Sequence, residues 1–420
     1  MAKLARSAVL TTSASVAILA CLLYGQQEVF LKVSTEGFQK TAIDVAPVRS
    51  NDSSDYAEEL RQIVINDLNL SGLFVVVGSD RSASSDSTDD RPEPSVRLDA
   101  AVEIQNRNFT LNAKLNELPS HDTIFTKKYK AELTKKRWTA HELANDIVNY
   151  LTGERGMGHT QIAFVRKIGN GKEIGVMDYD GYGEQLLTRN GSLNLSPAWS
   201  PSADRLVFTG YMMGNPDLYL LHLASGKTAK ISRFNNLYSA PAWSPNGKRI
   251  AFTMSVDGNA DFYTMDEKGG NLTKLTNSLA IDSSPSWSPN GRELVFTSDR
   301  SGSPQLYIMN ADGTDVRRLT FEGRYNDSPA WSPRGDLIAF VSRLEGEFQV
   351  FTIDVNGESL RQLTFEGSNE NPSWAPNGVK LAFASNRNGK WNIYMMNRDG
   401  SDLKQVTVNG ENTMPKWSAN

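Results

Sequence analysis

The chain has 420 residues, which is more than one hydrophobic core usually organises, so we expect two domains. Its formal net charge is −4, and it carries neither a block of Lys and Arg residues nor a platform of aromatic residues. This composition argues against a nucleic-acid partner. The single cysteine, Cys21, excludes a disulfide framework.

Residues 1–25 have the pattern of an export signal. Lys3 and Arg6 give the start a positive charge, and an apolar stretch follows them. We expect cleavage after Gly25, while lipidation of Cys21 and an uncleaved membrane anchor stay open as alternatives. An exported chain without disulfides suits the periplasm, the space between two bacterial membranes.

Residues 26–152 form a predicted α/β domain. Apolar residues alternate at 28–33 and 41–46 as in strands, and residues 74–77 are a further β-branched run. Between these runs, residues 55–70 carry apolar side chains at helical spacing, which predicts a helix.

The second half of this domain shows the same mixture. Residues 82–95 are rich in Ser, Asp and Pro and are predicted to form a loop. Clean alternation predicts strands over residues 96–104 and 109–115. Thr139–Glu142 has the pattern of a capping box, which predicts the start of a helix that ends at Gly153.

Six tryptophans recur at nearly constant spacing in the rest of the chain. They are Trp199, Trp243, Trp287, Trp331, Trp374 and Trp417, at intervals of 44, 44, 44, 43 and 43 residues. Each follows a proline by two positions. A period of about 40–45 residues with several short β patterns is typical of a β-propeller. We expect the tryptophans to pack between its blades.

One unit shows how the period divides into four strands. Residues 289–291, 299–302 and 311–313 read Pro-Asn-Gly, Asp-Arg-Ser-Gly and Ala-Asp-Gly. They predict turns because Gly and Asn tolerate the positive φ that tight hairpins require. Residues 294–296 and 306–309 are short β-branched and aromatic runs, as in buried strands.

The two ends of the repeat array complement each other. The first unit starts at Gln161 without a Pro-x-Trp segment, and the last such segment, at residues 415–417, has no strands after it. One blade built from both ends removes an exposed sheet edge. We therefore predict a mainly β fold, with a six-bladed propeller over residues 160–420 behind the small α/β domain.

Mostly polar residues recur three positions before each proline of the Pro-x-Trp segments. The six positions hold Asn194, Tyr238, Asp282, Asn326, Asn369 and Asn412, and five of them are followed directly by Ser239, Ser283, Asp327, Glu370 and Thr413. We predict that these residues lie at the mouth of the channel and bind a partner, with Tyr238 as an aromatic anchor. The alternative is that Asn and Asp cap turns through nearby backbone and that Tyr238 fills space between blades.

Enzyme motifs are missing from the sequence. There is no Gly-x-Ser-x-Gly elbow, and the four histidines have no metal-ligand spacing, so we predict no catalytic residue, no metal site and no cofactor. Asp282, Asp327 and Glu370 fall on neighbouring blades. A lyase or glycosidase acting in the channel, a small-ligand sensor and a weak Ca²⁺ site therefore stay open as alternatives.

Several segments share the features of one known family. They are the export signal, Ile147-Val-Asn-Tyr-Leu-Thr-Gly153, Thr160-Gln-Ile-Ala-Phe-Val165, Met177-Asp-Tyr-Asp-Gly-Tyr182, the Pro-x-Trp-Ser-Pro units and the terminal Pro415-Lys-Trp-Ser418. Together they resemble the TolB family, the periplasmic component of the Tol-Pal system of Gram-negative bacteria. Peptidase and lyase propellers also carry Trp-Ser-Pro units, so the domain order and residues 178–182 make the resemblance specific.

The resemblance implies binding and not catalysis. TolB-like proteins dock Pal, a peptidoglycan-associated outer-membrane lipoprotein, at the propeller channel, and TolA, which reaches from the inner membrane, through an N-terminal segment. In this chain the segment is Glu28, Val29, Phe30, Leu31, Lys32 and Val33. It suits strand addition to a partner, and packing back on the protein is the alternative. The implied role is to support outer-membrane integrity and invagination during cell division.

Overall fold

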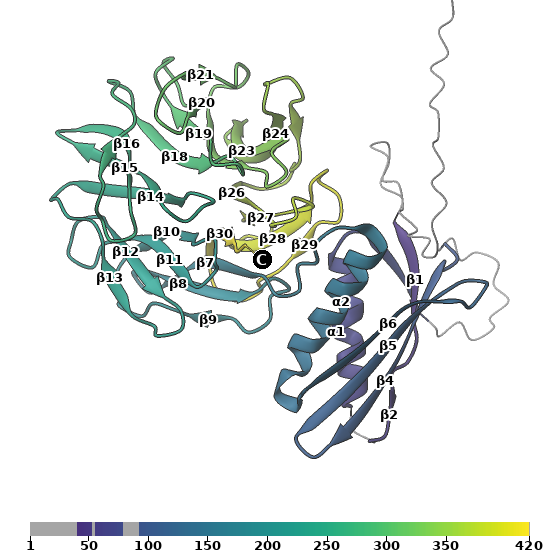
Figure 1. Cartoon of the computed structure of the whole chain (residues 1–420). Helices are drawn as coiled ribbons and strands as arrows, with labels where there is room; N and C mark the ends of the chain where they lie inside the picture. The colour runs from purple at the N-terminus through teal and green to yellow at the C-terminus, as the bar shows by residue number, and fades with distance from the viewer. Residues whose placement is uncertain (1–39, 53–54, 79–91, 420) are drawn as a thin grey trace, which may run out of the picture.

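The computed structural model describes residues 40–52, 55–78 and 92–419 (Figure 1). The predicted export signal and the segment 28–33 lie outside these residues. The chain forms a small α/β domain followed by a six-bladed propeller, as the repeats predicted. In the described ranges, no helix combines the length and the apolar character needed to cross a bilayer.

The α/β domain is one mixed sheet with two helices against one face (Figure 1). Its strands are β1 (Thr41–Val45), β2 (Arg49–Ser50), β3 (Phe74–Gly78), β4 (Val96–Gln105), β5 (Asn108–Glu117) and β6 (Thr123–Glu132). The helices are α1 (Tyr56–Leu70) and α2 (Lys136–Thr152), with a 3₁₀ turn, η1 (Leu133–Lys135), before α2. The strand order is β3-β1-β4-β5-β6, and β2 pairs with β4.

The apolar alternation explains the core of this domain. In β4 and β5 every second side chain is buried, so one face of each strand packs against the helices while the other meets solvent. Leu60, Val64 and Leu68 of α1 share a core with Leu143 and Ile147 of α2. The predicted helix at 55–70 and the predicted strands at 41–46, 74–77, 96–104 and 109–115 are confirmed, while the strand predicted at 28–33 lies outside the described residues.

Two features of the domain differ from the prediction. The capping box is wrong, because α2 already starts at Lys136 and the Thr139 hydroxyl donates to the carbonyl of Lys135 from inside the helix. The helix does end at Gly153, whose φ of 71° favours glycine. Strand β6 was not predicted. Only Tyr129 is buried along it, so this edge strand lacks the apolar alternation that marks its neighbours.

Six four-stranded sheets make the propeller, each running outward from the channel. The inner strands are β10 (Asn194–Trp199), β14 (Leu237–Trp243), β18 (Asp282–Trp287), β22 (Asn326–Trp331), β26 (Asn369–Trp374) and β30 (Asn412–Trp417). The second strands are β11 (Arg205–Gly210), β15 (Ile250–Val256), β19 (Glu293–Ser298), β23 (Leu337–Leu344), β27 (Lys380–Ser385) and β7 (Gln161–Ile168).

The outer half of each blade is less regular. The third strands are β12 (Asp217–His222), β16 (Asn259–Met265), β20 (Gln305–Asn310), β24 (Glu347–Asp354), β28 (Asn392–Asn397) and β8 (Gly171–Asp178). The outer strands are β13 (Thr228–Lys230), β17 (Thr273–Lys274), β21 (Arg317–Arg318), β25 (Arg361–Gln362), β29 (Lys404–Gln405) and β9 (Gln185–Leu186). Short outer strands limit the edge that each blade exposes.

The last strand of the chain closes the ring. β30 pairs antiparallel with β7, with Trp417 opposite Ile162, and the closing blade has the order β30-β7-β8-β9. The prediction that the two ends of the array build one blade is confirmed. The C-terminal strand is therefore the innermost strand of a blade that otherwise belongs to the start of the propeller.

The tryptophans connect neighbouring blades. All six are buried, and three indole Nε1 atoms donate to a carbonyl on the preceding inner strand. These bonds join Trp199 to Lys416 at 2.9 Å, Trp287 to Ala242 at 3.1 Å and Trp374 to Ala330 at 2.9 Å. The structure therefore confirms the prediction that the six tryptophans pack between blades.

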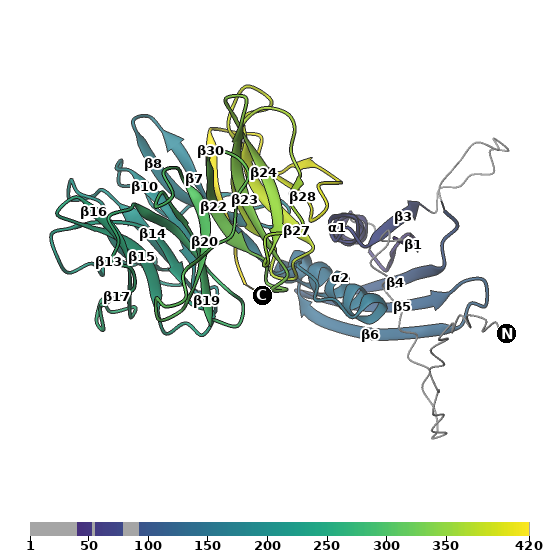
Figure 2. The same ribbon diagram turned by 90° about the horizontal axis from the view of Figure 1, so that it is seen from above.

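The two domains meet on one side of the ring (Figure 2). Arg137 of α2 pairs with Asp178, at the end of β8, and Glu154 pairs with Arg334 between β22 and β23. These contacts lie where the inner strands end at their tryptophans, and we call this side the domain face. The opposite side, where the inner strands begin, is the open face, and no described part of the α/β domain covers it.

We expect Trp287→Ala to lower the free energy of unfolding by about 3–5 kcal/mol, because it opens a cavity between two blades and removes the bond to Ala242. Urea unfolding followed by circular dichroism measures the change. Phe365→Ala is the control, since 73% of that side chain is exposed and its loss should shift stability by less than about 0.5 kcal/mol. Equal losses in the two variants would contradict the interblade role.

Candidate docking face and domain interface

Loops from every blade form the open face. In the first complete blade, Asn194 at the start of β10 pairs with Gly210 at the end of β11, and Gly210 pairs with Asp217 at the start of β12. The loops between the second and third strands therefore share this side with the loops that enter each inner strand. The predicted channel-mouth residues all lie at or next to these entry points.

The ring of six predicted partner-binding side chains is buried. Asn194, Tyr238, Asp282, Asn326, Asn369 and Asn412 are each at most 1% exposed. The expectation that they present polar groups at the mouth is corrected on this point, because their side chains bond to neighbouring strands and loops. Asn194, Asn326 and Asn369 each donate to the third strand of the preceding blade. For these six positions the structure shows the alternative, a local structural role.

Hydrogen bonds explain why these positions favour Asn and Asp. The amide of Asn326 donates to the carbonyl of Glu322 at 2.8 Å, and the amide of Asn412 donates to the carbonyl of Asn409 at 2.7 Å, so each side chain closes the loop that precedes it. Asp282 accepts two bonds from Arg300, at 3.0 and 3.2 Å. Buried polar groups of this kind must be paired, and these residues are.

Tyr238 is part of the same structural layer. Its ring lies 5.6 Å from that of Phe252, and its hydroxyl accepts a bond from the backbone N–H of Phe234 at 3.2 Å. With 1% of its surface exposed, it cannot be an anchor for a partner without moving, so that expectation is also corrected. The residue it holds in place, Phe234, is 53% exposed on the open face.

The residues that follow the buried ring are accessible. Ser239 is exposed, and Ser283, Asp327, Glu370 and Thr413 are half-buried. Burial, with the nearby Asp327 carboxylate as a second cause, raises the pKa of Glu370 above its ordinary value. These polar groups surround the start of the channel, and their role in partner binding stays a prediction.

The three carboxylates of the alternative enzyme or Ca²⁺ site do not converge. Asp282 is buried on Arg300, while Asp327 accepts bonds from Thr297 at 2.8 Å and from Tyr325 at 3.2 Å. Among the described residues, one set of three acidic or histidine side chains comes close together, and it contains none of Asp282, Asp327 and Glu370. Asp282 is thus engaged within its own blade, while Asp327 and Glu370 lie near each other, and the three carboxylates do not form one cluster of oxygen ligands.

Large apolar side chains form a rim on the open face that sequence reasoning missed. We define the apolar rim by the loop residues Leu193, Met213, Phe234, Leu279, Phe321, Phe365 and Val408. Their exposed fractions include 72% for Phe321, 73% for Phe365 and 74% for Met213. A signal was present, because two units carry the same Leu-Thr-Phe-Glu-Gly segment at 319–323 and 363–367, which places an aromatic residue directly after an outer strand.

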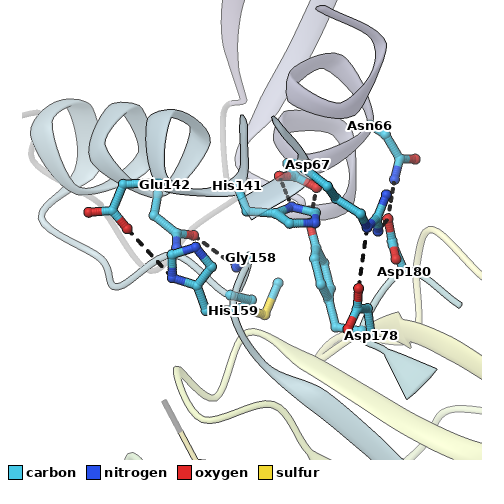
Figure 3. Close-up of polar contacts among 12 residues, drawn as sticks. Asn66, Asp67, His141, Glu142, Gly158, His159, Asp178 and Asp180 are labelled. Carbon is cyan, nitrogen blue, oxygen red and sulfur yellow. Dashed lines mark hydrogen bonds and ion pairs between the residues drawn. The ribbon is translucent and has the colours of Figure 1, made fainter. Parts of the chain in front are cut away.

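A buried hydrogen-bond network joins the α/β domain to the domain face (Figure 3). Asp67 of α1 is 4% exposed and lies 2.6 Å from Nδ1 of His141 on α2. Its other oxygen accepts a bond at 2.6 Å from the hydroxyl of Tyr179, which follows β8 of the propeller. Because Nε2 of His141 has no partner among the described atoms, the tautomer protonated at Nδ1 avoids a buried unpaired donor.

Arg137 forms the second part of the interface. Its Nε donates to Asp178 at 3.2 Å and its terminal nitrogen donates to Asp180 at 2.5 Å. The guanidinium also lies 4.0 Å from the centroid of the Tyr182 ring. Sequence reasoning singled out the segment 177–182 as a family marker, and the structure shows that this segment carries the propeller's contacts to α1 and α2.

The same network contains the one group of described residues with three potential metal ligands close together. Ligand atoms of Asp67, His141 and Asp180 lie within 4.8 Å of one another. Each of the two carboxylates is already bonded, Asp67 to His141 and Tyr179, and Asp180 to Arg137. The guanidinium of Arg137 already supplies a positive charge next to Asp180. The geometry therefore fits an interdomain contact better than a metal centre.

We expect Arg137→Ala to weaken the contact between the two domains by about 1–3 kcal/mol, because it leaves two carboxylates facing each other without their cation. Hydrogen exchange should then accelerate in α2 and in residues 178–182 while the inner strands stay protected. Arg107→Ala, which changes an exposed arginine in the turn between β4 and β5, is the control. Unchanged exchange at 178–182 would show that the ion pairs do not hold the domains together.

The interface should also respond to pH. Burial raises the pKa of the Asp67 carboxyl, against the opposing effect of the bond to His141. At a pH between the two pKa values, the Asp67 carboxyl is protonated in the folded state and ionised in the unfolded chain. The free energy of unfolding therefore falls as the pH rises from the unfolded pKa through the folded pKa.

Asp67→Asn removes that titration. Between about pH 4 and pH 7, the stability of the variant relative to the wild type should increase with pH, since only the wild type pays for a buried carboxylate. Thermal unfolding of both chains across this range measures the difference. A difference that stays constant with pH would contradict the assignment.

Family models match both parts of the chain. A model described as the TolB β-propeller domain matches residues 148–420, and one described as the TolB amino-terminal domain matches residues 29–98. The crystal structure of TolB from Acinetobacter baumannii is similar with a TM-score of 0.80 at 26% identity, over 91% of this chain and 97% of that chain.

Named relatives agree with the family models. The Tol-Pal system protein TolB of Geobacter metallireducens is 40% identical over 206 residues, which are 46% of this chain and 48% of that protein. The protein of the same name from Anaeromyxobacter dehalogenans is 34% identical over 229 residues, 51% of this chain and 52% of that protein. The aligned part thus spans about half of the length of these two relatives. Since the family model for the propeller covers more than half of the chain and the fold agrees over nearly all of it, the chain belongs to the TolB family of Tol-Pal system proteins.

Proposed function

We propose that this protein is a non-catalytic periplasmic scaffold of the Tol-Pal system. Its open face binds a Pal-like peptidoglycan-associated lipoprotein, and residues 28–33, which lie outside the described part of the chain, bind a TolA-like protein of the inner membrane. Through these partners it supports outer-membrane integrity and invagination during cell division. The protein is peripheral to the outer membrane and reaches it through its lipoprotein partner.

The apolar rim is the observation that carries this proposal. Seven large side chains lie exposed around one channel mouth, and exposed apolar surface of this kind is unfavourable unless a partner covers it. The half-buried Ser283, Asp327 and Glu370 lie inside the rim and offer hydrogen-bonding groups to the same partner. An apolar rim around polar groups supports protein docking better than turnover of a small substrate.

The closing blade supports communication between the two partner sites. On the open face, Arg166 of β7 donates to Asn412 of β30 at 2.8 Å. On the domain face, the residues after β8 of the same blade bind Asp67 and Arg137. A partner that displaces the loop before β30 therefore perturbs the same blade that contacts the α/β domain. If binding at the open face changes the affinity of the α/β domain for its partner, binding there must change the affinity of the open face by the same factor.

The test is the affinity of the full exported chain for the soluble domain of the organism's own peptidoglycan-associated lipoprotein, measured by calorimetry. Replacing both Phe321 and Phe365 with Ser should raise the Kd at least tenfold, because aromatic residues dominate interface energies. The matched control replaces Val316 and Leu403 with Ser. These two residues are 39% and 43% exposed but lie in the turns before outer strands, on the domain face.

The outcome separates the docking surfaces. Loss of affinity in the first variant and not in the second places the lipoprotein on the open face. Equal affinity of both variants, with unchanged melting temperatures, would exclude the apolar rim. Deleting residues 28–33 should abolish binding of the TolA-like protein and leave lipoprotein binding in place, since the two sites are separate.

A further inference from the structure

The channel widens into a cavity of about 520 Å³ on the domain face, away from the apolar rim. Its wall is the set of six Trp-Ser-Pro-type segments together with Arg155 of the linker and Lys416 of the last inner strand. A narrower cavity of about 110 Å³ occupies the middle of the channel. Lys416 is the one residue that lines both, so it lies where the channel narrows.

Lys416 departs from the pattern of the other five blades. The residue directly before the tryptophan is Ala198, Ala242, Ser286, Ala330 or Ser373 elsewhere, and a lysine only in the closing blade. Small side chains leave the centre of the ring open, and the two serines are engaged, with Ser286 accepting a bond from the N–H of Trp331 at 3.1 Å. A charged side chain at this position is therefore an addition to the repeat and not part of its packing.

The cavity is positively charged and has no acidic wall. Lys416 and Arg155 line it, and no Asp or Glu does. Within the described ranges, the ammonium of Lys416 and the guanidinium of Arg155 form no hydrogen bond or ion pair with a side chain. Burial lowers the pKa of Lys416, because no carboxylate compensates for the lost hydration. Lys416 is half-buried and Arg155 is exposed, and an ammonium that has lost part of its hydration without gaining an opposite charge favours an anion that enters the cavity.

The remaining wall combines apolar and polar atoms. Indole rings and prolines alternate around the cavity, with serine residues between them. The volume is within the range of about 300–1,000 Å³ that is usual for small-molecule sites, whose walls are mostly apolar with a few polar groups. A bare inorganic ion would contact the cation but leave most of this wall unused.

We propose that the domain-face cavity binds a small organic anion, whose carboxylate or phosphate group pairs with Lys416 and Arg155 and whose ring-shaped or apolar body lies against the tryptophans and prolines. Arg155 belongs to the linker between the domains, so the bound anion ties that linker to the propeller. The site lies on the opposite side of the ring from the docking face and does not depend on the proposed partners.

The experiment titrates the full exported chain with a charged probe and its neutral counterpart. N-benzoylglycine carries a carboxylate next to an aromatic ring, and N-benzoylglycinamide has the same shape without the charge. We expect the acid to change tryptophan fluorescence and to bind at least tenfold more tightly than the amide, with an affinity that falls as NaCl rises to 0.5 M. Phenyl phosphate and inorganic phosphate, tested in parallel, distinguish a phosphate-bearing ligand from a carboxylate and from a bare ion.

The variant Lys416→Ala should weaken binding of the acid at least tenfold, and Arg155→Gln should weaken it about three- to tenfold. Lys416→Ala restores the residue that three other blades carry, so its melting temperature should equal or exceed that of the wild type. Lys227→Ala, which changes an exposed lysine in the β12–β13 turn, is the control for net charge.

Three results would overturn the proposal. They are equal binding of acid and amide, binding that Lys416→Ala and added salt leave unchanged, and binding of inorganic phosphate as tight as that of phenyl phosphate. The salt titration needs only the wild type, so the proposal stays testable even if a variant folds poorly.

Discussion

Ring closure by the last strand is the constraint on which the rest of the structure depends. β30 comes from the C-terminus, yet it is the inner strand of the blade that begins at Gln161. Without it, β7 would present an unpaired edge, which invites non-native pairing. The pairing also puts Trp417 against Thr160, at the start of the propeller, where the indole donates to the threonine hydroxyl at 2.9 Å.

The two faces of the closed ring differ in chemistry. The open face carries exposed apolar loops above the buried, ion-paired carboxylates of Asp217, Asp261 and Asp282. The domain face carries a buried carboxylate, histidine and tyrosine between the domains. Exposed apolar surface and buried polar groups both cost free energy in the isolated protein. A protein retains such features where binding or domain contact offsets the cost, which is consistent with a scaffold whose two sides serve different partners.

The position of a residue in the repeat decides whether it is accessible. Asn326 and Asp327 are adjacent in the sequence, yet the first is buried and the second is half-buried, accepting a bond from Thr297 of the neighbouring blade. Both residues pair regularly with β23, so the ordinary alternation of side chains along a strand separates them, and the irregular pairing follows only between Asp327 and Ala330. The sequence pattern assigned contact to both neighbours, and the structure buries the first residue of each pair, while contact by the second stays a prediction.

The sequence alone determined the architecture, because the fold rests on local and periodic signals. The six Pro-x-Trp segments, the turn tripeptides and the unmatched ends of the array predicted six blades and their closure, and the segments 147–153 and 177–182 indicated the family. Tertiary structure decided the rest. His141 and Tyr179 lie 74 and 112 residues after Asp67 in the sequence, so no spacing rule connects the three residues. The apolar rim and the cavity around Lys416 likewise form only when loops and strands of all the blades meet around one channel, since a ring brings together residues that the sequence places a full period apart.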